Sequence, residues 1–245
     1  MRLALLLIVV ALAVPAVLLA APADEPPPPP QPLPPVATGT PAPLPPVATP
    51  TPEPLPPSRA AGRPWQGRLI GGRQLPLRGE GFATWDPILK RVDNRPWRRW
   101  GTDRLLRTLR DVLAAHARRH PGAPPVLVGD LSRPRGGDFG PRFGGIGHAS
   151  HQNGLDADVY YPRLDGRLRR ARRPDQVDRA AAQELVDAFV REGAEYVFVG
   201  PSLGLRGPRK VVQALTHHDD HLHLRLQSRR SHELARASKP HSITG

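Results

Sequence analysis

Six of the ten histidines lie in two short stretches of the sequence, and one of the six is His217, adjacent to His218. His148 and His151 belong to the first stretch, and His218, His221 and His223 belong to the second. On a β-strand, side chains alternate between two faces, so His221 and His223 would share one face while the neighbouring leucines point into a core. Two imidazoles held in this way can point into a single cleft.

The first stretch leads from a loop of small and polar residues into an expected strand that begins near Asp156. Asp156 and Asp158 would share one face of that strand. A loop histidine, a strand aspartate and a histidine from the distant strand supply two imidazoles and one carboxylate and leave a coordination position open. This ligand set is typical of catalytic zinc rather than structural zinc. Non-heme iron oxygenases use a similar set, but they place the histidine and the carboxylate close together on one strand.

Composition narrows the other options. The chain contains no cysteine, which excludes disulfides and cysteine zinc sites, so a transition metal must be held by His, Asp or Glu. The formal net charge is +13, which favours contact with an anionic partner. Aromatic residues make up only 5% of the chain, and no nucleic-acid-binding motif is present. An acidic wall polymer or a membrane surface accounts for the charge, and no nucleic-acid partner is expected.

The N-terminal region indicates export. Residues 1–23 have one positive charge, a long apolar run and a small-residue triplet, as in a signal peptide. The apolar run is also long enough to span a bilayer, so a cleaved signal and a membrane anchor both remain open. Residues 24–66 are proline-rich and repetitive, which predicts a disordered, extended linker. The expected location is the periplasm or the exterior, with a tether to the inner membrane if the segment stays uncleaved.

Residues 67–227 are expected to form a single domain, followed by a polar tail over residues 228–245. Hydrophobic periodicity predicts a helix that begins at Thr102 or Asp103 and another that runs from Asp175 to Gly193. Strands are expected at residues 125–130, 156–161, 195–199 and 220–226. Because helices and strands do not alternate regularly, the expected fold class is α+β, with a small central antiparallel sheet and flanking helices.

The spacing of the histidines and aspartates resembles the metal signature of the lysostaphin, D-Ala-D-Ala peptidase and Sonic hedgehog group. Within that group the chain resembles the penicillin-insensitive murein endopeptidases across roughly residues 68–226. The supporting segments occur in the same order along the chain: Gly71–Leu77, Asn94–Trp97, Val128–Ser132, Pro134–Gly137, Gly147–Gln152, Gly154–Asp156 and His218–His223. Two departures are the absence of cysteine and the different length or composition of residues 138–143 and 163–173.

The resemblance implies a zinc ion held by His151, Asp158 and His223. It also implies that His221 is the catalytic base or stabilises the transition state, with His218 and His148 lining the same pocket.

Other residues around this site have expected roles from the sequence itself. The resemblance, however, is what makes Asp220 the rival catalytic base, because related carboxypeptidases place an acidic residue three positions before the last zinc ligand; on a strand Asp220 would face away from His223. Asp156 could orient a ligand imidazole, and Arg133 and Arg135 could clamp a substrate carboxylate. The remaining histidines are expected at the surface, on a helix or in the tail: His116, His120, His232 and His241.

The resulting hypothesis is a zinc metallo-endopeptidase that hydrolyses peptide cross-links of the D-alanyl to diaminopimelate type in peptidoglycan. Two alternatives stay open: a D,D-carboxypeptidase or dipeptidase of the same group, and a non-catalytic zinc-containing wall-binding module. The sequence does not decide which bond of the cross-link is cut.

Overall fold

A computed structural model describes residues 56–140 and 148–228 of the chain. The expected signal segment, most of the expected linker and nearly all of the expected tail lie outside these ranges, as do His232 and His241. Within the described ranges, the helices are too short or too polar to cross a membrane.

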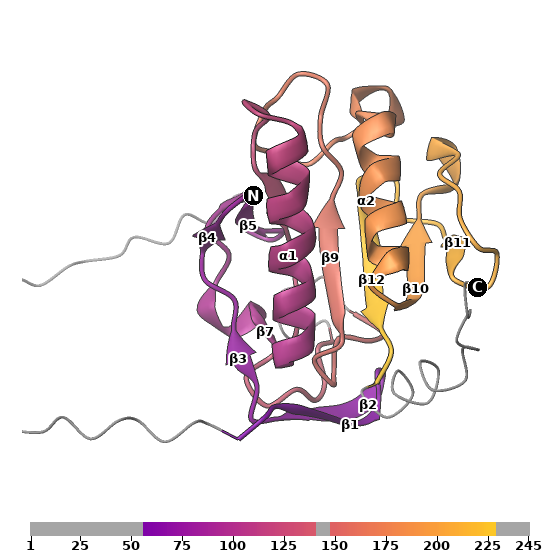
Figure 1. Cartoon of the computed structure of the whole chain (residues 1–245). Helices are drawn as coiled ribbons and strands as arrows, with labels where there is room; N and C mark the ends of the chain where they lie inside the picture. Colours follow the sequence, from indigo (N-terminus) through magenta and orange to yellow (C-terminus); the bar gives the residue numbers. More distant parts are fainter. Residues whose placement is uncertain (1–55, 141–147, 229–245) are drawn as a thin grey trace, which may run out of the picture. The chain divides into compact units, whose positions relative to one another are not determined.

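An eight-stranded sheet forms the centre of the domain (Figure 1). Seven strands follow the order β11-β10-β12-β9-β8-β5-β4, and β6 pairs with β5. Their bounds are β4 Arg78–Gly79, β5 Phe82–Asp86, β6 Arg91–Val92, β8 Val126–Val128, β9 Asp156–Tyr160, β10 Ala194–Val199, β11 Val212–Ala214 and β12 His221–Leu226.

The fold class α+β is confirmed, but the expectation of a small antiparallel sheet is wrong. The sheet is mixed, because β5 pairs in parallel with β8 and β10 pairs in parallel with β11. A parallel pair needs a long crossover, and helix α1 (Asp103–Arg119) lies in the connection from β5 to β8. Strands of two or three residues, such as β4 and β11, are too short to produce a visible alternation pattern.

Both helices begin at side-chain caps. The hydroxyl of Thr102 accepts a hydrogen bond from the Leu105 N–H at 3.2 Å, which satisfies a free donor in the first turn of α1. Helix α2 spans Arg179–Arg191 and is capped in the same way by Asp178. The expected start at Asp175 is wrong, because residues 174–176 form a short 3-10 turn and Val177 is extended. Among the described residues, the other 3-10 turns are η1 Pro96–Arg98 and η4 Pro201–Leu203.

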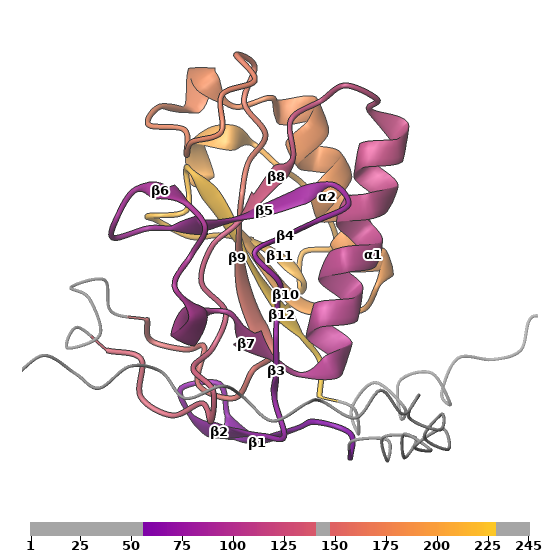
Figure 2. The ribbon, with the colours of Figure 1, turned by 90° about the vertical axis from the view of Figure 1, so that its left-hand side faces the viewer.

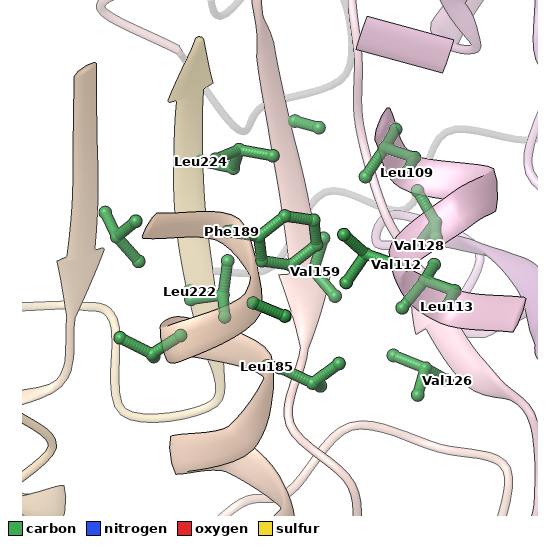
Figure 3. Packing of buried hydrophobic residues seen from close by; sticks show 14 of the residues in the cluster. Leu109, Val112, Leu113, Val126, Val128, Val159, Leu185, Phe189, Leu222 and Leu224 are labelled. Atoms are coloured by element: carbon green, nitrogen blue, oxygen red, sulfur yellow. The ribbon is translucent and has the colours of Figure 1, made fainter. Parts of the chain in front are cut away.

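The two helices cover one face of the sheet (Figures 1 and 2). Alternation along the strands sends apolar side chains to this face, where they pack against α1 and α2 in one cluster (Figure 3). That cluster includes Val126, Val128, Val159, Leu222 and Leu224 from the strands and Leu109, Leu113, Leu185 and Phe189 from the helices. The alternate residues of the same strands therefore point to the opposite face, which carries the polar side chains described next.

Two further strand pairs precede α1. Strand β1 (Arg59–Arg63) forms a hairpin with β2 (Gln66–Ile70), and β3 (Arg73–Gln74) pairs with β7 (Trp100–Gly101). Strand β1 lies inside the range 24–66 that was expected to be a disordered linker. The ordered chain therefore begins before residue 67, because the high proline content of that range concealed a short strand at its end.

Candidate metal centre

Adjacent strands β9 and β12 bring the key side chains together. Their antiparallel register pairs His223 with Asp158, Arg225 with Asp156 and His221 with Tyr160. All six of these residues point away from the helices, since their strand neighbours lie in the core cluster. The sequence pattern alone predicted this orientation for both strands.

The loop before β9 contributes His151, which is fully buried. Its backbone has φ of +67°, a left-handed conformation that costs a non-glycine residue about 1 kcal/mol or more. The side chain is fixed from behind, because its Nδ1 lies 2.7 Å from the carbonyl oxygen of Leu131. Strained backbone and a single fixed ring orientation are typical of functional sites.

Three electron-pair donors converge at one point. His151 Nε2 lies 3.2 Å from His223 Nδ1 and 3.3 Å from Asp158 Oδ1, and His223 Nδ1 lies 3.2 Å from the same carboxylate oxygen. We call His151, Asp158 and His223 the cleft cluster. Three atoms each bound to zinc at about 2.0–2.1 Å in tetrahedral geometry are separated by about 3.3–3.4 Å. The spacing of the cleft cluster therefore fits a zinc ion.

Hydrogen bonds on the far side of each ring support the same conclusion. His151 donates its Nδ1 proton to Leu131, and His223 donates its Nε2 proton to Asp156 Oδ1 at 2.9 Å. When the His223 ring loses the extra proton that Asp156 and Asp158 favour, His151 Nε2 and His223 Nδ1 turn lone pairs toward each other and toward the Asp158 carboxylate. Three electron-rich atoms at this spacing repel one another unless a cation lies between them. A carboxylate or carbonyl partner behind a ligand imidazole is the usual arrangement at metal sites.

His148 also places a ring nitrogen within 4.8 Å of ligand atoms on His151 and Asp158, so these three residues form an alternative His-His-Asp group. Its Nε2, however, lies 2.8 Å from Asp130 Oδ2, and its Nδ1 is 3.9 Å from Asp158 Oδ2. His223 is closer to both partners, so it is the better third ligand. The ring of His148 lies beside that of His151 at an interplanar angle of 45°, with centroids 4.2 Å apart.

Burial and neighbouring charges shift the pKa values of the cleft cluster in opposite directions. Burial lowers the pKa of the His151 imidazole, which keeps its ring neutral and able to bind a metal. Burial alone would raise the pKa of Asp158, but the neighbouring His151 and His221 hold it well below its usual value. Burial alone would lower the pKa of His223, but Asp156 and Asp158 raise it to about 9. A cation is strongly favoured next to these carboxylates.

His221 lies beside the cleft cluster, with Nε2 3.8 Å from Asp158 Oδ1. Its Nδ1 donates to Asp220 Oδ1 at 2.7 Å, so the lone pair on Nε2 points toward the cleft cluster. Asp220 is itself held by Arg170, whose Nη1 lies 2.7 Å from Oδ2. Burial would lower the pKa of His221, but the carboxylates of Asp158 and Asp220 outweigh it and raise that pKa.

His218 stands next to His221, with ring centroids 4.9 Å apart. Its Nδ1 lies 2.9 Å from the carbonyl oxygen of Thr216, and burial lowers the pKa of its ring. His218 is therefore a neutral imidazole whose free nitrogen, Nε2, can accept a hydrogen bond.

Sequence reasoning missed Asp130, a buried carboxylate behind the site. Asp130 is paired with the fully buried Arg98 through both of its oxygens, with Nε to Oδ1 at 2.7 Å, and it also holds His148. Asp130 lies two residues after the buried strand β8, and a carboxylate so close to an apolar strand could have singled it out. Arg98 gave no sequence signal, since it lies among several arginines in a polar segment.

The arginines near the site differ from the expected ones. Arg133 donates to the carbonyl oxygen of Asp138, and Arg135 is exposed; neither is among the described residues that line the cleft above the cleft cluster. The cleft wall instead includes arginines from the loop after β9 and aromatic residues. The lining residues include Trp65, Trp85, Tyr160, Arg169, Arg170, Arg172 and Phe198, together with His148, Asp158, His218, His221 and His223.

Known proteins share part of this sequence. The sequence profile described as penicillin-insensitive murein endopeptidase matches residues 60–197, more than half of the chain. The matched range contains His151 and Asp158 and ends before His218. The penicillin-insensitive murein endopeptidase of Haemophilus influenzae is 37% identical over 94 residues, which cover 38% of this chain and 28% of the relative.

Penicillin-insensitive murein endopeptidases from Salmonella paratyphi B and Salmonella newport are each 35% identical over 94 residues, covering 38% of this chain and 29% of each relative. The chain therefore spans less than a third of the length of the curated relatives it matches. The profile match, together with the geometry of the cleft cluster, settles the family: this chain belongs to the penicillin-insensitive murein endopeptidases.

Proposed function

We propose that the chain is a zinc metallo-endopeptidase that hydrolyses the D-alanyl to diaminopimelate type of peptide cross-link in bacterial peptidoglycan. The observation that carries this proposal is the cleft cluster: two lone pairs and one carboxylate oxygen converge within 3.3 Å beneath an open cleft. Such a set leaves room for water at the metal, which suits hydrolysis rather than a purely structural role.

His151, Asp158 and His223 are the proposed ligands, through Nε2, Oδ1 and Nδ1. A bound zinc ion supplies a Lewis acid, which lowers the pKa of water toward about 7 and polarises a carbonyl group. Leu131 and Asp156 fix the two ligand rings, so little reorganisation is needed when the ion binds.

His221 is the proposed general base. Its Nε2 takes a proton from the attacking water and then delivers that proton to the amine of the leaving strand. Asp220 supports this role rather than replacing His221, because its carboxylate accepts the Nδ1 proton and thereby fixes the useful tautomer. The raised pKa of His221 makes Nε2 a stronger proton acceptor than an ordinary imidazole.

His218 is proposed to orient the same water or the leaving amine. Its ring is neutral and its Nδ1 is occupied by Thr216, so only Nε2 is available as an acceptor. His148 supports His151 from the side and is anchored by Asp130. Neither residue is proposed as a ligand.

The arginine wall of the cleft suits the substrate. Stem peptides of peptidoglycan carry free carboxylates, and guanidinium groups bind carboxylates through paired hydrogen bonds. Arg169 and Arg172 are proposed for this contact, since Arg170 is already engaged by Asp220. Arg133 and Arg135 remain candidates for binding a part of the substrate that extends beyond the described cleft wall.

A peptidoglycan substrate agrees with the expected export. We propose a periplasmic or secreted enzyme whose folded domain, beginning near residue 59, follows an N-terminal signal or anchor and a proline-rich linker. A tether to the inner membrane requires that the N-terminal segment stays uncleaved.

Mass spectrometry of peptidoglycan fragments tests the activity. Purified protein with zinc should convert cross-linked dimers into monomers. Release of terminal D-alanine without loss of dimers would instead indicate a carboxypeptidase, and an unchanged digest with tight binding would indicate a non-catalytic wall-binding module. Elemental analysis of the purified protein tests the metal: zinc supports the proposal, and iron would contradict it.

A further inference from the structure

A second group of potential ligands lies on the other face of the domain, between the two helices. His116 belongs to α1, His120 caps its C-terminal end, and Glu184 belongs to α2. One ligand atom from each lies within 4.8 Å of the others. We call these residues the helix cluster. The expectation that His116 is a surface residue is wrong, because only 3% of it is exposed.

The contacts within the helix cluster are incompletely satisfied. His120 Nε2 lies 2.7 Å from Glu184 Oε2, whereas His116 Nδ1 is 3.9 Å from the same oxygen, too far for a hydrogen bond. The buried His116 Nδ1 has no hydrogen-bond partner among the described residues. A buried polar atom without a partner is costly and requires an explanation, such as an ion.

Helix geometry makes the histidine pair suitable for a ligand. Residues four positions apart lie on the same face of a helix, and here the two rings are 4.5 Å apart between centroids. His120 and Glu184 have side-chain exposures of 34% and 43%, so an ion can reach them from solvent. Burial lowers the pKa of His116, and the hydrogen bond from His120 lowers the pKa of Glu184, so a neutral imidazole and a carboxylate are available.

We propose that His116, His120 and Glu184 bind a divalent transition-metal ion, such as zinc or nickel, that links α1 to α2. Two imidazoles and a carboxylate form a suitable ligand set for both ions. Arg119, whose Nε lies 3.8 Å from Glu184 Oε2, opposes the cation only weakly because both side chains are nearly half exposed. The bound ion replaces the direct contact between His120 and Glu184 and provides the missing partner for His116.

The proposed role is structural. An ion that binds the folded protein and not the unfolded chain raises the melting temperature as its concentration increases. The helix cluster lies on the helix-covered face, away from the residues of the cleft, so it should not contribute to peptide hydrolysis. The proposal does not depend on the proposed function.

Metal titration of the full chain tests the proposal, with zinc alone and nickel alone as probes. Wild type should bind two equivalents. His120→Ala and Glu184→Gln should each bind one equivalent and keep full hydrolytic activity, whereas His223→Ala should lose the equivalent in the cleft. Glu80→Gln is the matched control, because it removes a carboxylate paired with Arg118 of α1 without touching the helix cluster.

Melting curves in the His223→Ala background provide the second measurement. Zinc should raise the melting temperature of this variant, and adding His120→Ala should abolish that rise while leaving the metal-free melting curve cooperative. The proposal is overturned if the His223→Ala variant binds no metal, or if His120→Ala leaves the stoichiometry and the zinc-induced shift unchanged. If the wild-type protein binds metal at the helix cluster but does not hydrolyse cross-links, that result would count against the proposed function alone.

Discussion

Two histidines and one carboxylate meet on each face of the same sheet, but their surroundings differ. In the cleft cluster, each ligand imidazole is held from behind by a carbonyl or carboxylate oxygen. In the helix cluster, His116 lacks such a partner among the described residues, and His120 is bound directly to the would-be third ligand. The cleft cluster is therefore organised before a metal binds, whereas the helix cluster must rearrange.

This difference separates a site suited to chemistry from one suited to stability. Preorganised donors on two neighbouring strands and an adjoining loop hold an ion in a single geometry, which hydrolysis requires. The donors of the helix cluster, of which His120 and Glu184 are partly exposed to solvent, can adjust at the cost of weaker binding. The comparison also predicts that the two faces respond independently to mutation, and the following substitutions test that independence.

The largest expected effect is on catalysis at the cleft. His221→Ala should lower the rate of cross-link hydrolysis by about 10²–10⁴-fold, because it removes the proposed general base, and should leave the zinc content of the cleft unchanged. His120→Ala provides the matched histidine control on the other face and should hydrolyse at the wild-type rate. Kinetics on purified cross-linked dimers, with zinc analysis of each variant, measure both. Full activity of His221→Ala would contradict its role as the base.

The second expected effect is on stability beneath the cleft. Arg98 and Asp130 form a buried ion pair with no exposed side-chain surface. Arg98→Met should lower the free energy of unfolding by about 3–5 kcal/mol, because the Asp130 carboxylate is left buried without its guanidinium partner. Urea denaturation measures this loss.

Arg78→Met is the control for the buried pair, since it breaks the exposed pair with Asp93 and should change stability little. Equal losses in the two variants would mean that burial does not set the strength of the Arg98 pair.

A smaller effect, on zinc affinity, is expected for Asp156, which lies behind the proposed ligand His223. Asp156 accepts hydrogen bonds from His223 Nε2 and from Arg225 Nε at 2.7 Å. Asp156→Asn should weaken zinc binding by about 10–100-fold, because an amide holds the imidazole less firmly and reduces its basicity. Competition with a chromophoric chelator measures the affinity, with the exposed Asp93→Asn as control. Unchanged affinity would show that the support behind His223 does not matter.

Much of the cleft could be predicted from the sequence, because local alternation determines it. The pattern of His221 to Leu226 and of Asp156 to Tyr160 already assigns each side chain to a face, and the two strands are long enough for that pattern to be visible. The apolar stripe of α1 was also predicted from a local pattern, and its cap was predicted at Thr102 or Asp103; the structure places it at Thr102.

The features that the sequence did not predict depend on contacts between distant segments. The pairing of Arg98 with Asp130 and the parallel neighbours of β8 and β10 are properties of the folded sheet and leave no local pattern. His116 did leave a signal, because it continues the stripe of Leu109, Val112 and Leu113 at helical spacing. His116 was expected at the surface because histidine is polar, although its place on the apolar stripe indicated burial.

The smallest expected effect tests the helix face without touching either cluster. Thr102→Ala should lower the free energy of unfolding by about 1 kcal/mol, because the Leu105 N–H loses its acceptor at the start of α1. Thr102→Ser keeps the hydroxyl and should restore most of the loss. Hydrolysis per folded molecule and zinc stoichiometry should stay at wild-type values in both variants. A parallel loss of hydrolysis well below the melting temperature would mean that the helix layer and the cleft are coupled through the sheet.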